Sequence, residues 1–257
     1  MVNNVNSSYK IYLINLDEST DRLQSCTQRL TSQGLSFERI SAVLGRALVG
    51  AEKYKHYSLS DNEKKYFRAL TDGEIGCYLS HRKAWEMIAS GDEKFGVVLE
   101  DDIELKGRLD LALDALDTVP FDWQIMKLSA YRNRTRRSLL SKPVTHQFRV
   151  VVQSKPMSGC AATAISKSAA KKLLLSTSTF GRPVDVDIQH FWETGVNVFS
   201  LLPYPVAQDI SMESTIVGRH GTASKSFWKR KRQQLSSLLL NRSSVRKQLM
   251  DTKKNWD

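Results

Sequence analysis

Short apolar runs alternate with amphipathic stretches along the first part of the chain. Residues 10–16 (KIYLINL) form an apolar run bounded by polar residues, which predicts a buried strand. Residues 17–34 place apolar side chains at helical spacing and end at a glycine, and residues 36–43 (SFERISAV) predict a second strand. A strand, a helix and a strand in close succession predict a βαβ unit, whose right-handed crossover makes the two strands parallel.

The clearest helical pattern covers residues 71–91. Thr71 and Glu74 have the spacing of a capping box, apolar and aromatic residues follow on one face, and Gly91 ends the pattern. Residues 44–70 before it are polar and rich in Tyr and Lys, which predicts a loop with short helices.

The rest of the chain continues to mix strands and helices. We expect strands at residues 95–99, 122–129 and 196–202, a pair of strands at 148–154 and 160–166, and helices at 109–116, 167–177 and 183–195. Residues 130–143 contain five basic residues and no acidic one, which predicts a mobile basic loop. This order of elements predicts an α/β fold with a mostly parallel sheet flanked by helices. At 257 residues we expect one main domain, residues 1–222, and a basic, amphipathic helical segment, residues 223–257.

The positive charge is concentrated at the end of the chain. The net charge is +11, and residues 225–257 hold 10 Lys or Arg against 2 Asp, so the remainder is close to balanced.

The three cysteines are widely spaced without a CxxC pattern, which is typical of a reducing compartment. No apolar stretch approaches the ~20 residues needed to span a bilayer, and the first residues lack the pattern of a signal peptide. We therefore expect a cytoplasmic protein.

The basic segment also carries apolar residues at intervals. Trp228, Leu235, Leu239, Val245 and Leu249 alternate with Lys and Arg. A basic amphipathic helix of this kind can lie on an anionic membrane surface. It can equally pack one apolar stripe against its own domain, and the sequence leaves both interpretations open.

Three carboxylates follow the third predicted strand in the segment VVLEDDIEL. Glu100 and Asp102 are one residue apart at the end of an apolar run, and ligands of open α/β sheets bind beyond such strand ends. Carboxylate oxygens suit Mg²⁺ or Mn²⁺, which commonly complete their coordination with substrate phosphates. An acidic turn at the start of the following helix explains the same spacing, so the pattern alone does not decide between the two.

Four segments together resemble glycosyltransferase family 25, which includes bacterial lipooligosaccharide galactosyltransferases and the catalytic regions of collagen galactosyltransferases. They are YLINLDESTDRL, GEIGCYLSHRKAW, VVLEDDIEL and CAATAISKSAAKKLL, in the order and at roughly the spacing of the family, from about residue 9 to residue 210. The resemblance implies a GT-A-like fold and a nucleotide-sugar donor. It also implies Mn²⁺ or Mg²⁺ bound at an acidic motif similar to D-x-D, although the first residue here is Glu.

The resemblance assigns candidate roles to individual residues. Glu100 and Asp102 become the outer pair of the acidic motif, with Asp102 as metal ligand, Glu100 as second ligand nearer the ribose, and His220 as a late metal ligand. The donor-binding candidates are Asn15, Arg22, Ala42, Ser80, His81, Glu100, Asp101 and Asp102.

Transfer with inversion also needs a base for the acceptor hydroxyl. Asp185 and Asp187 are the candidates, and His81 is a further catalytic candidate. Structural roles remain open for all of them, such as a helix-terminal charge pair for the two aspartates and a hydrogen-bonded packing residue for the histidine.

The resulting hypothesis is a metal-assisted, UDP-sugar-dependent hexosyltransferase. We expect transfer of galactose with inversion to a lipooligosaccharide-type glycan or glycolipid acceptor, with the basic tail as a possible membrane contact. One alternative is a metal-dependent nucleotidyltransferase or phosphohydrolase, which would need further acidic ligands at neighbouring strand ends. A nucleic-acid-binding protein is the other, but the body of the chain is nearly neutral and shows no binding motif.

Overall fold

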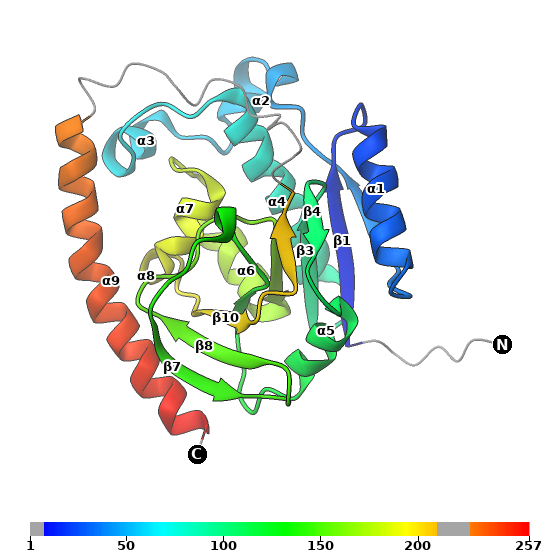
Figure 1. The fold of residues 1–257 in the computed structure, drawn as a ribbon. Helices are drawn as coiled ribbons and strands as arrows, with labels where there is room; N and C mark the ends of the chain where they lie inside the picture. Colours follow the sequence, from blue (N-terminus) through cyan, green and yellow to red (C-terminus); the bar gives the residue numbers. More distant parts are fainter. Residues whose placement is uncertain (1–7, 210–226, 257) are drawn as a thin grey trace.

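The fold is an α/β arrangement around one large sheet (Figure 1). The computed structural model describes residues 8–209 and 227–256. The strands of the large sheet are β1 (Tyr9–Asn15), β2 (Glu38–Ser41), β3 (Phe95–Glu100), β5 (Ile125–Lys127), β7 (Ser138–Pro143), β8 (Arg149–Gln153), β9 (Ala162–Ser166) and β10 (Val198–Leu202). The helices of the described residues are α1 (Thr20–Thr31), α2 (Gly50–Tyr54), α3 (Leu59–Lys65), α4 (Asp72–Ser90), α5 (Leu109–Asp117), α6 (Lys167–Ser176), α7 (Val184–Gln189), α8 (Phe191–Thr194) and α9 (Phe227–Trp256), with 3₁₀ turns at Gly45–Ala47 and Tyr131–Asn133.

The large sheet has the strand order β2-β1-β3-β9-β5-β10-β8-β7. β1 pairs in parallel with β2 and β3, and β5 pairs in parallel with β10, whereas β9 and β8 run opposite to the other strands. The predicted βαβ unit is therefore confirmed as β1–α1–β2. The predicted class is confirmed too: a mostly parallel sheet flanked by helices, with the acidic cluster at the end of β3 and a helical C-terminal segment.

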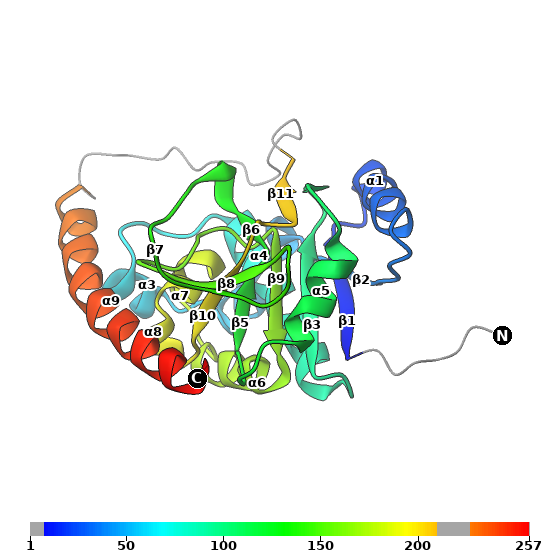
Figure 2. The same ribbon diagram turned by 60° about the horizontal axis from the view of Figure 1, so that its bottom comes forward.

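A second, smaller sheet lies above the carboxyl ends of the large one (Figure 2). Its strands are β4 (Ile103–Leu105), β6 (Ser129–Ala130) and β11 (Val206–Gln208), in the order β4-β11-β6. β11 pairs antiparallel to β4, with Gln208 opposite Ile103. This pairing brings the end of β11 next to the acidic cluster that follows β3.

Helix α4 has the start and the packing that the sequence predicts. The Thr71 hydroxyl accepts from the backbone N–H of Glu74 at 3.2 Å, and the Glu74 carboxylate accepts from the backbone N–H of Thr71 at 3.0 Å. A Cβ on Gly76 would lie 2.4 Å from the backbone oxygen of Val43, so this position requires glycine. The close approach fixes α4 against the segment after β2 and thereby positions the polar residues one turn further along α4.

Three predictions about local structure are wrong. Residues 130–143 do not form a mobile loop, because they contain the end of β6, a 3₁₀ turn and β7, which pairs with β8. The single helix predicted at 183–195 is split into α7 and α8 at His190, whose φ of −90° and ψ of 45° are not helical. β8 and β9 both form as predicted, but they do not pair with each other: β8 pairs with β10 and β7, and β9 with β3 and β5.

Helix α9 packs one stripe against the main body of the fold. Val245 is 3% exposed, the Asn241 amide donates to the backbone oxygen of Ser154 at 2.7 Å, and the Gln248 amide donates to that of Val198 at 3.0 Å. The apolar residues at the start of the helix face solvent: Trp228 is 79%, Leu235 64% and Leu239 63% exposed. Among the described residues, no helix combines the length and the apolar character needed to cross a membrane. The domain division at residue 222 falls outside the described residues and stays a prediction.

Candidate functional site

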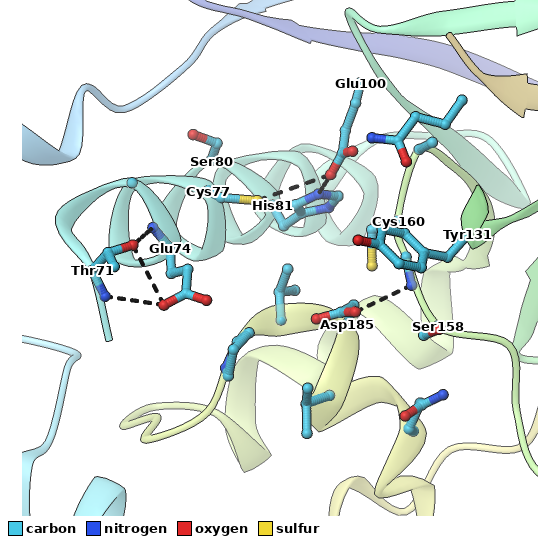
Figure 3. A pocket seen from close by; sticks show the side chains of 18 of the residues that line it. Thr71, Glu74, Cys77, Ser80, His81, Glu100, Tyr131, Ser158, Cys160 and Asp185 are labelled. Atoms are coloured by element: carbon cyan, nitrogen blue, oxygen red, sulfur yellow. Dashed lines mark hydrogen bonds and ion pairs between the residues drawn. The ribbon is translucent and has the colours of Figure 1, made fainter. Parts of the chain in front are cut away.

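A large pocket opens at the carboxyl ends of β1 and β3, where the sequence predicts the donor site (Figure 3). Its lining includes all eight predicted donor-binding residues and one of the two candidate bases, namely Asn15, Arg22, Ala42, Ser80, His81, Glu100, Asp101, Asp102 and Asp185. Candidate residues that lie far apart in the sequence therefore meet around one cavity.

Asp101 joins the ends of β1 and β3. Its carboxylate accepts from the amide of Asn15 at 2.8 Å and from the guanidinium of Arg22 at 3.2 Å. Asn15 is 1% exposed, and its amide oxygen accepts from Arg39 at 3.0 Å. Asp101 therefore organises this edge of the pocket through Asn15 and Arg22.

Asp102 is the acidic residue with the most unusual surroundings. One carboxylate oxygen, Oδ2, accepts from the Gln208 amide at 2.7 Å, whereas the buried Oδ1 has no hydrogen-bond partner among the described residues. Burial and then the charge of Glu100 raise the pKa of Asp102 to about 6. A buried carboxylate oxygen without a donor is costly, and a divalent cation would offset this cost.

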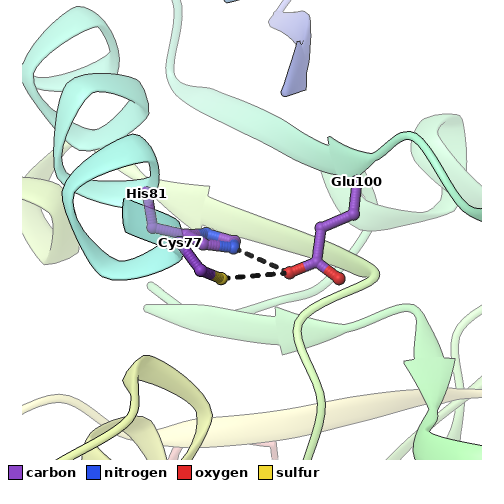
Figure 4. Close-up of side chains that lie close together, drawn as sticks. All are labelled: Cys77, His81 and Glu100. Carbon is purple, nitrogen blue, oxygen red and sulfur yellow. Dashed lines mark hydrogen bonds and ion pairs between the residues drawn. The ribbon is translucent and has the colours of Figure 1, made fainter. Parts of the chain in front are cut away.

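Glu100 faces two side chains of α4 (Figure 4). Its Oε1 lies 3.0 Å from Nε2 of His81 and 3.9 Å from Sγ of Cys77. One ligand atom from each of the three residues lies within 4.8 Å of the others. This set of a thiol, an imidazole and a carboxylate is typical of Zn²⁺, whereas the Glu100 and Asp102 carboxylates are the type of ligand that Mn²⁺ and Mg²⁺ prefer.

Ser80 and Ala42 lie at the end of the pocket formed by the chain after β2. Ser80 is 1% exposed, its hydroxyl accepts from the backbone N–H of Val43 at 2.8 Å and donates to the backbone oxygen of Gly76 at 2.7 Å. The backbone N–H of Ala42 donates to the backbone oxygen of Asn15 at 2.9 Å. Ser80 thus holds the backbone that follows β2, and Ala42 can contact a ligand there without a polar side chain.

The structure separates the two candidate bases. Asp185 lines the pocket and accepts from the backbone N–H of Gly159 at 3.2 Å (Figure 3). Asp187 lies outside the lining, where its carboxylate is 3.0 Å from Arg182 and accepts from the Tyr78 hydroxyl at 2.9 Å. Burial raises the pKa of Asp187 despite its ion pair with Arg182. Of the two candidates, only Asp185 lines the pocket.

The proposed metal ligands are only partly within the described residues. His220 lies outside them, so the structure does not place this predicted ligand. Glu100 and Asp102 both line the pocket, and the charge of Glu100 adds to burial in raising the pKa of Asp102. Together with the unpartnered Oδ1 of Asp102, this carboxylate pair fits a hard divalent cation.

Several pocket residues were not foreseen from the sequence. Gln208 contacts Asp102 from β11, a strand of three residues that has no detectable periodicity. Tyr131, Arg136 and Lys155 line the pocket from segments that were expected to be loops or strand ends. The five basic residues of segment 130–143 were the available signal, although they predicted mobility rather than a pocket wall.

Comparisons with known proteins agree with the motifs. The family model described as glycosyltransferase family 25 (LPS biosynthesis protein) matches residues 8–188. Procollagen galactosyltransferase 1 of Danio rerio is 27% identical over 224 residues, which cover 76% of this chain but 36% of that protein. A putative glycosyltransferase of Haemophilus influenzae is 28% identical over 183 residues, which cover 71% of this chain and 62% of that protein.

One solved structure aligns with most of this chain, but the sequence identity between the two is low. A Drosophila β-1,4-galactosyltransferase 7 mutant in complex with manganese, UDP-galactose and xylobiose aligns with a TM-score of 0.41 and 8% identity, covering 88% of this chain and 79% of that one. The chain spans about a third of the length of the procollagen galactosyltransferase that it matches. The family model, in contrast, covers well over half of this chain and contains the residues that form the acidic edge of the pocket, and the chain therefore belongs to glycosyltransferase family 25.

Proposed function

We propose that the protein transfers a hexose, with galactose the first choice, from a UDP-sugar to a glycan acceptor with inversion at the sugar. The observation that carries the proposal is the Asp102 carboxylate, which lines the pocket at the end of β3 with one buried oxygen unpartnered among the described residues. Family membership supports a sugar-transfer reaction, and the galactosyltransferase relative supports the choice of sugar.

Asp102 and Glu100 would hold a Mn²⁺ or Mg²⁺ ion on the pocket side of β3. When bound, such an ion compensates the negative charge that develops on the leaving diphosphate. Asp101 keeps this edge rigid because it is fixed by Asn15 and Arg22. The backbone after β2, held by Ser80, lines the end of the pocket where a uracil ring would lie against Ala42.

Asp185 is the proposed base of the reaction. Its carboxylate reaches the pocket from α7, and the backbone N–H of Gly159 fixes one of its oxygens. A positioned carboxylate can accept the proton of an acceptor hydroxyl as the new glycosidic bond forms. Transfer with inversion requires such a base on the acceptor side, and a β-linkage is the expected product from an α-linked donor.

The test is sugar transfer by wild-type protein and two variants. We expect UDP release from UDP-galactose, compared with UDP-glucose and UDP-N-acetylgalactosamine, to depend on added Mn²⁺ in the wild type. Asp102→Asn should lower turnover by at least about 100-fold because it removes a charged ligand. Glu104→Gln is the matched control, since Glu104 lies on the next strand in an ion pair with Lys106. Wild-type turnover by Asp102→Asn would remove the basis of the proposal.

The cellular setting of the reaction is also proposed. A lipooligosaccharide-type acceptor at the cytoplasmic side of a membrane would suit the start of α9, where Trp228 and Leu235 are exposed next to Lys and Arg residues. Co-sedimentation with vesicles containing anionic lipid should therefore weaken when Trp228 and Leu235 are both changed to Ser. Equal sedimentation of the variant and the wild type would exclude this contact.

A further inference from the structure

One side of the pocket is formed by basic side chains that the proposed donor chemistry does not use. They come from the segment before β7, the segment after β8 and the start of α9, and we call them the basic wall: Arg132, Arg134, Arg136, Lys155 and Arg230. In the part of the chain that the structure describes, none of the five forms an ion pair with a carboxylate. Within the described residues, no carboxylate therefore offsets the charge of the basic wall in an ion pair.

Arg132 and Arg134 of the basic wall are held in place by the Tyr131 ring and by the backbone around it. The guanidinium carbons of Arg132 and Arg134 lie 5.4 and 5.5 Å from the centroid of the Tyr131 ring. Arg132 has a φ of 49°, a left-handed conformation that costs a non-glycine residue on the order of 1 kcal/mol or more. Gly159, with a φ of +78°, packs so closely that an added Cβ would lie 3.0 Å from the Cβ of Tyr131. Strained backbone that is packed in this way is typical of a functional site.

The inner part of the wall has the surroundings that most favour an anionic ligand. Nε of Arg136 is buried and has no hydrogen-bond partner among the described residues. Burial lowers the pKa of Lys155, and the charge of Arg136 lowers it further, whereas Asp185 opposes the change. Lys155 and Arg136 repel each other, and the buried N–H of Arg136 has no acceptor among the described residues. Both effects cost folding free energy, and an anionic group bound between the two side chains would offset that cost.

The position of the wall identifies which substrate would supply that anion. Figures 1 and 2 place β7 and α9 on one side of the molecule and β1 and α1, which lead to the donor end of the pocket, on the other. Lys155 lies within electrostatic reach of Asp185, the proposed base. The group that approaches this base is the acceptor hydroxyl, whereas the donor diphosphate belongs at the acidic edge formed by Asp101 and Asp102.

We propose that the acceptor is an anionic glycan, with a phosphate or a sugar carboxylate that Arg136 and Lys155 bind close to the accepting hydroxyl. This inference rests on the proposed function, because it takes Asp185 as the base. Arg and Lys suit this task, since a guanidinium can bind a phosphate or carboxylate with two parallel hydrogen bonds and an ammonium adds a mobile charge. A neutral acceptor of the same size would leave both cations desolvated without a partner.

Calorimetric titration of the full chain tests the proposal. The protein is first saturated with UDP and Mn²⁺, so that the donor diphosphate site is filled, and then titrated with glucose 6-phosphate, glucuronate or glucose. We expect glucose 6-phosphate, glucuronate or both to bind at least about tenfold more tightly than glucose. Arg136→Gln and Lys155→Gln should each weaken binding of the anionic sugar by about tenfold and leave UDP binding unchanged.

Arg137→Gln is the matched control, because Arg137 is exposed, lies next in the sequence and is absent from the pocket lining. It should bind the anionic sugars as the wild type does. The proposal is overturned if all three sugars bind equally, if Arg137→Gln loses as much as Arg136→Gln, or if the two wall variants lose affinity for UDP instead. Failure of the wild type to bind UDP with Mn²⁺ would contradict the proposed function itself, which the first step of the titration reports separately.

Discussion

Asp185 and Asp187 lie two residues apart on α7 and have opposite surroundings. Successive residues of an α-helix are rotated by about 100°, so positions i and i+2 point to nearly opposite sides. Asp185 thereby reaches the pocket, and Asp187 reaches Arg182 and Tyr78 in the interior. The sequence singled out both carboxylates as candidates, but which of them faces the cavity depends on how α7 is rotated against α4.

Changing each aspartate to Asn should therefore have a different effect: one variant should lose turnover, and the other should lose stability. Asp185→Asn should lower kcat by about 10²- to 10⁴-fold, because it removes a general base, while Tm and UDP affinity stay at wild-type values. Asp187→Asn should destabilise the fold by about 3 kcal/mol, because a buried arginine loses one charged partner. Steady-state kinetics and thermal unfolding measure the two effects. Normal turnover by Asp185→Asn would rule it out as the base.

At the scale of elements, the strongly patterned segments were predictable and the weakly patterned ones were not. β1, α1, β3 and α4 each carry a local signal, such as an apolar run or a capping box, that needs no knowledge of the rest of the fold. β7 is an edge strand that pairs only with β8 among the described strands, and its side chains are mostly exposed. Because neither face of β7 is buried, its sequence has no alternation of apolar and polar residues to reveal it.

His190 connects α7 and α8 to the long helix α9. Its Nδ1 donates to the backbone oxygen of Val186 at 2.7 Å, and its Nε2 lies 3.1 Å from the hydroxyl of Ser237, which can donate to it. Burial and then the charge of Arg182 lower the pKa of His190 to about 4. The histidine is therefore neutral in the folded protein at neutral pH, in the tautomer that these two contacts require.

This lowered pKa predicts a pH dependence of stability. In the unfolded chain the pKa of a histidine is about 6.5, so between pH 6.5 and pH 4 the unfolded state binds a proton that the folded state does not. The free energy of unfolding should fall as the pH decreases through this window, by up to about 3 kcal/mol from this residue. His190→Gln should remove that contribution. Urea unfolding at pH 7, 6 and 5 compares the two proteins, and parallel pH profiles would contradict the assignment.

At the scale of the whole molecule, the pocket combines two regions of opposite charge. The acidic edge follows β3, and the basic wall is assembled from segments around residues 131–136, 155 and 230. The acidic edge could be predicted because its residues are adjacent in the sequence and follow a clear strand. The wall could not, because it exists only where distant segments come together, and such contacts leave no local pattern. The net charge of +11 pointed to a basic tail but did not show that part of the charge lines the pocket.

The central claim is that Asp102 and Glu100 hold the cation through which a UDP-sugar binds, and calorimetric titration of UDP-galactose tests it most directly. We predict that metal-free protein binds UDP-galactose weakly and that Mn²⁺ increases the affinity by at least about tenfold. Asp102→Asn should lose this increase, whereas Glu104→Gln should keep it. Binding of UDP-galactose that is the same with and without Mn²⁺, or the same in Asp102→Asn and the wild type, would contradict the account.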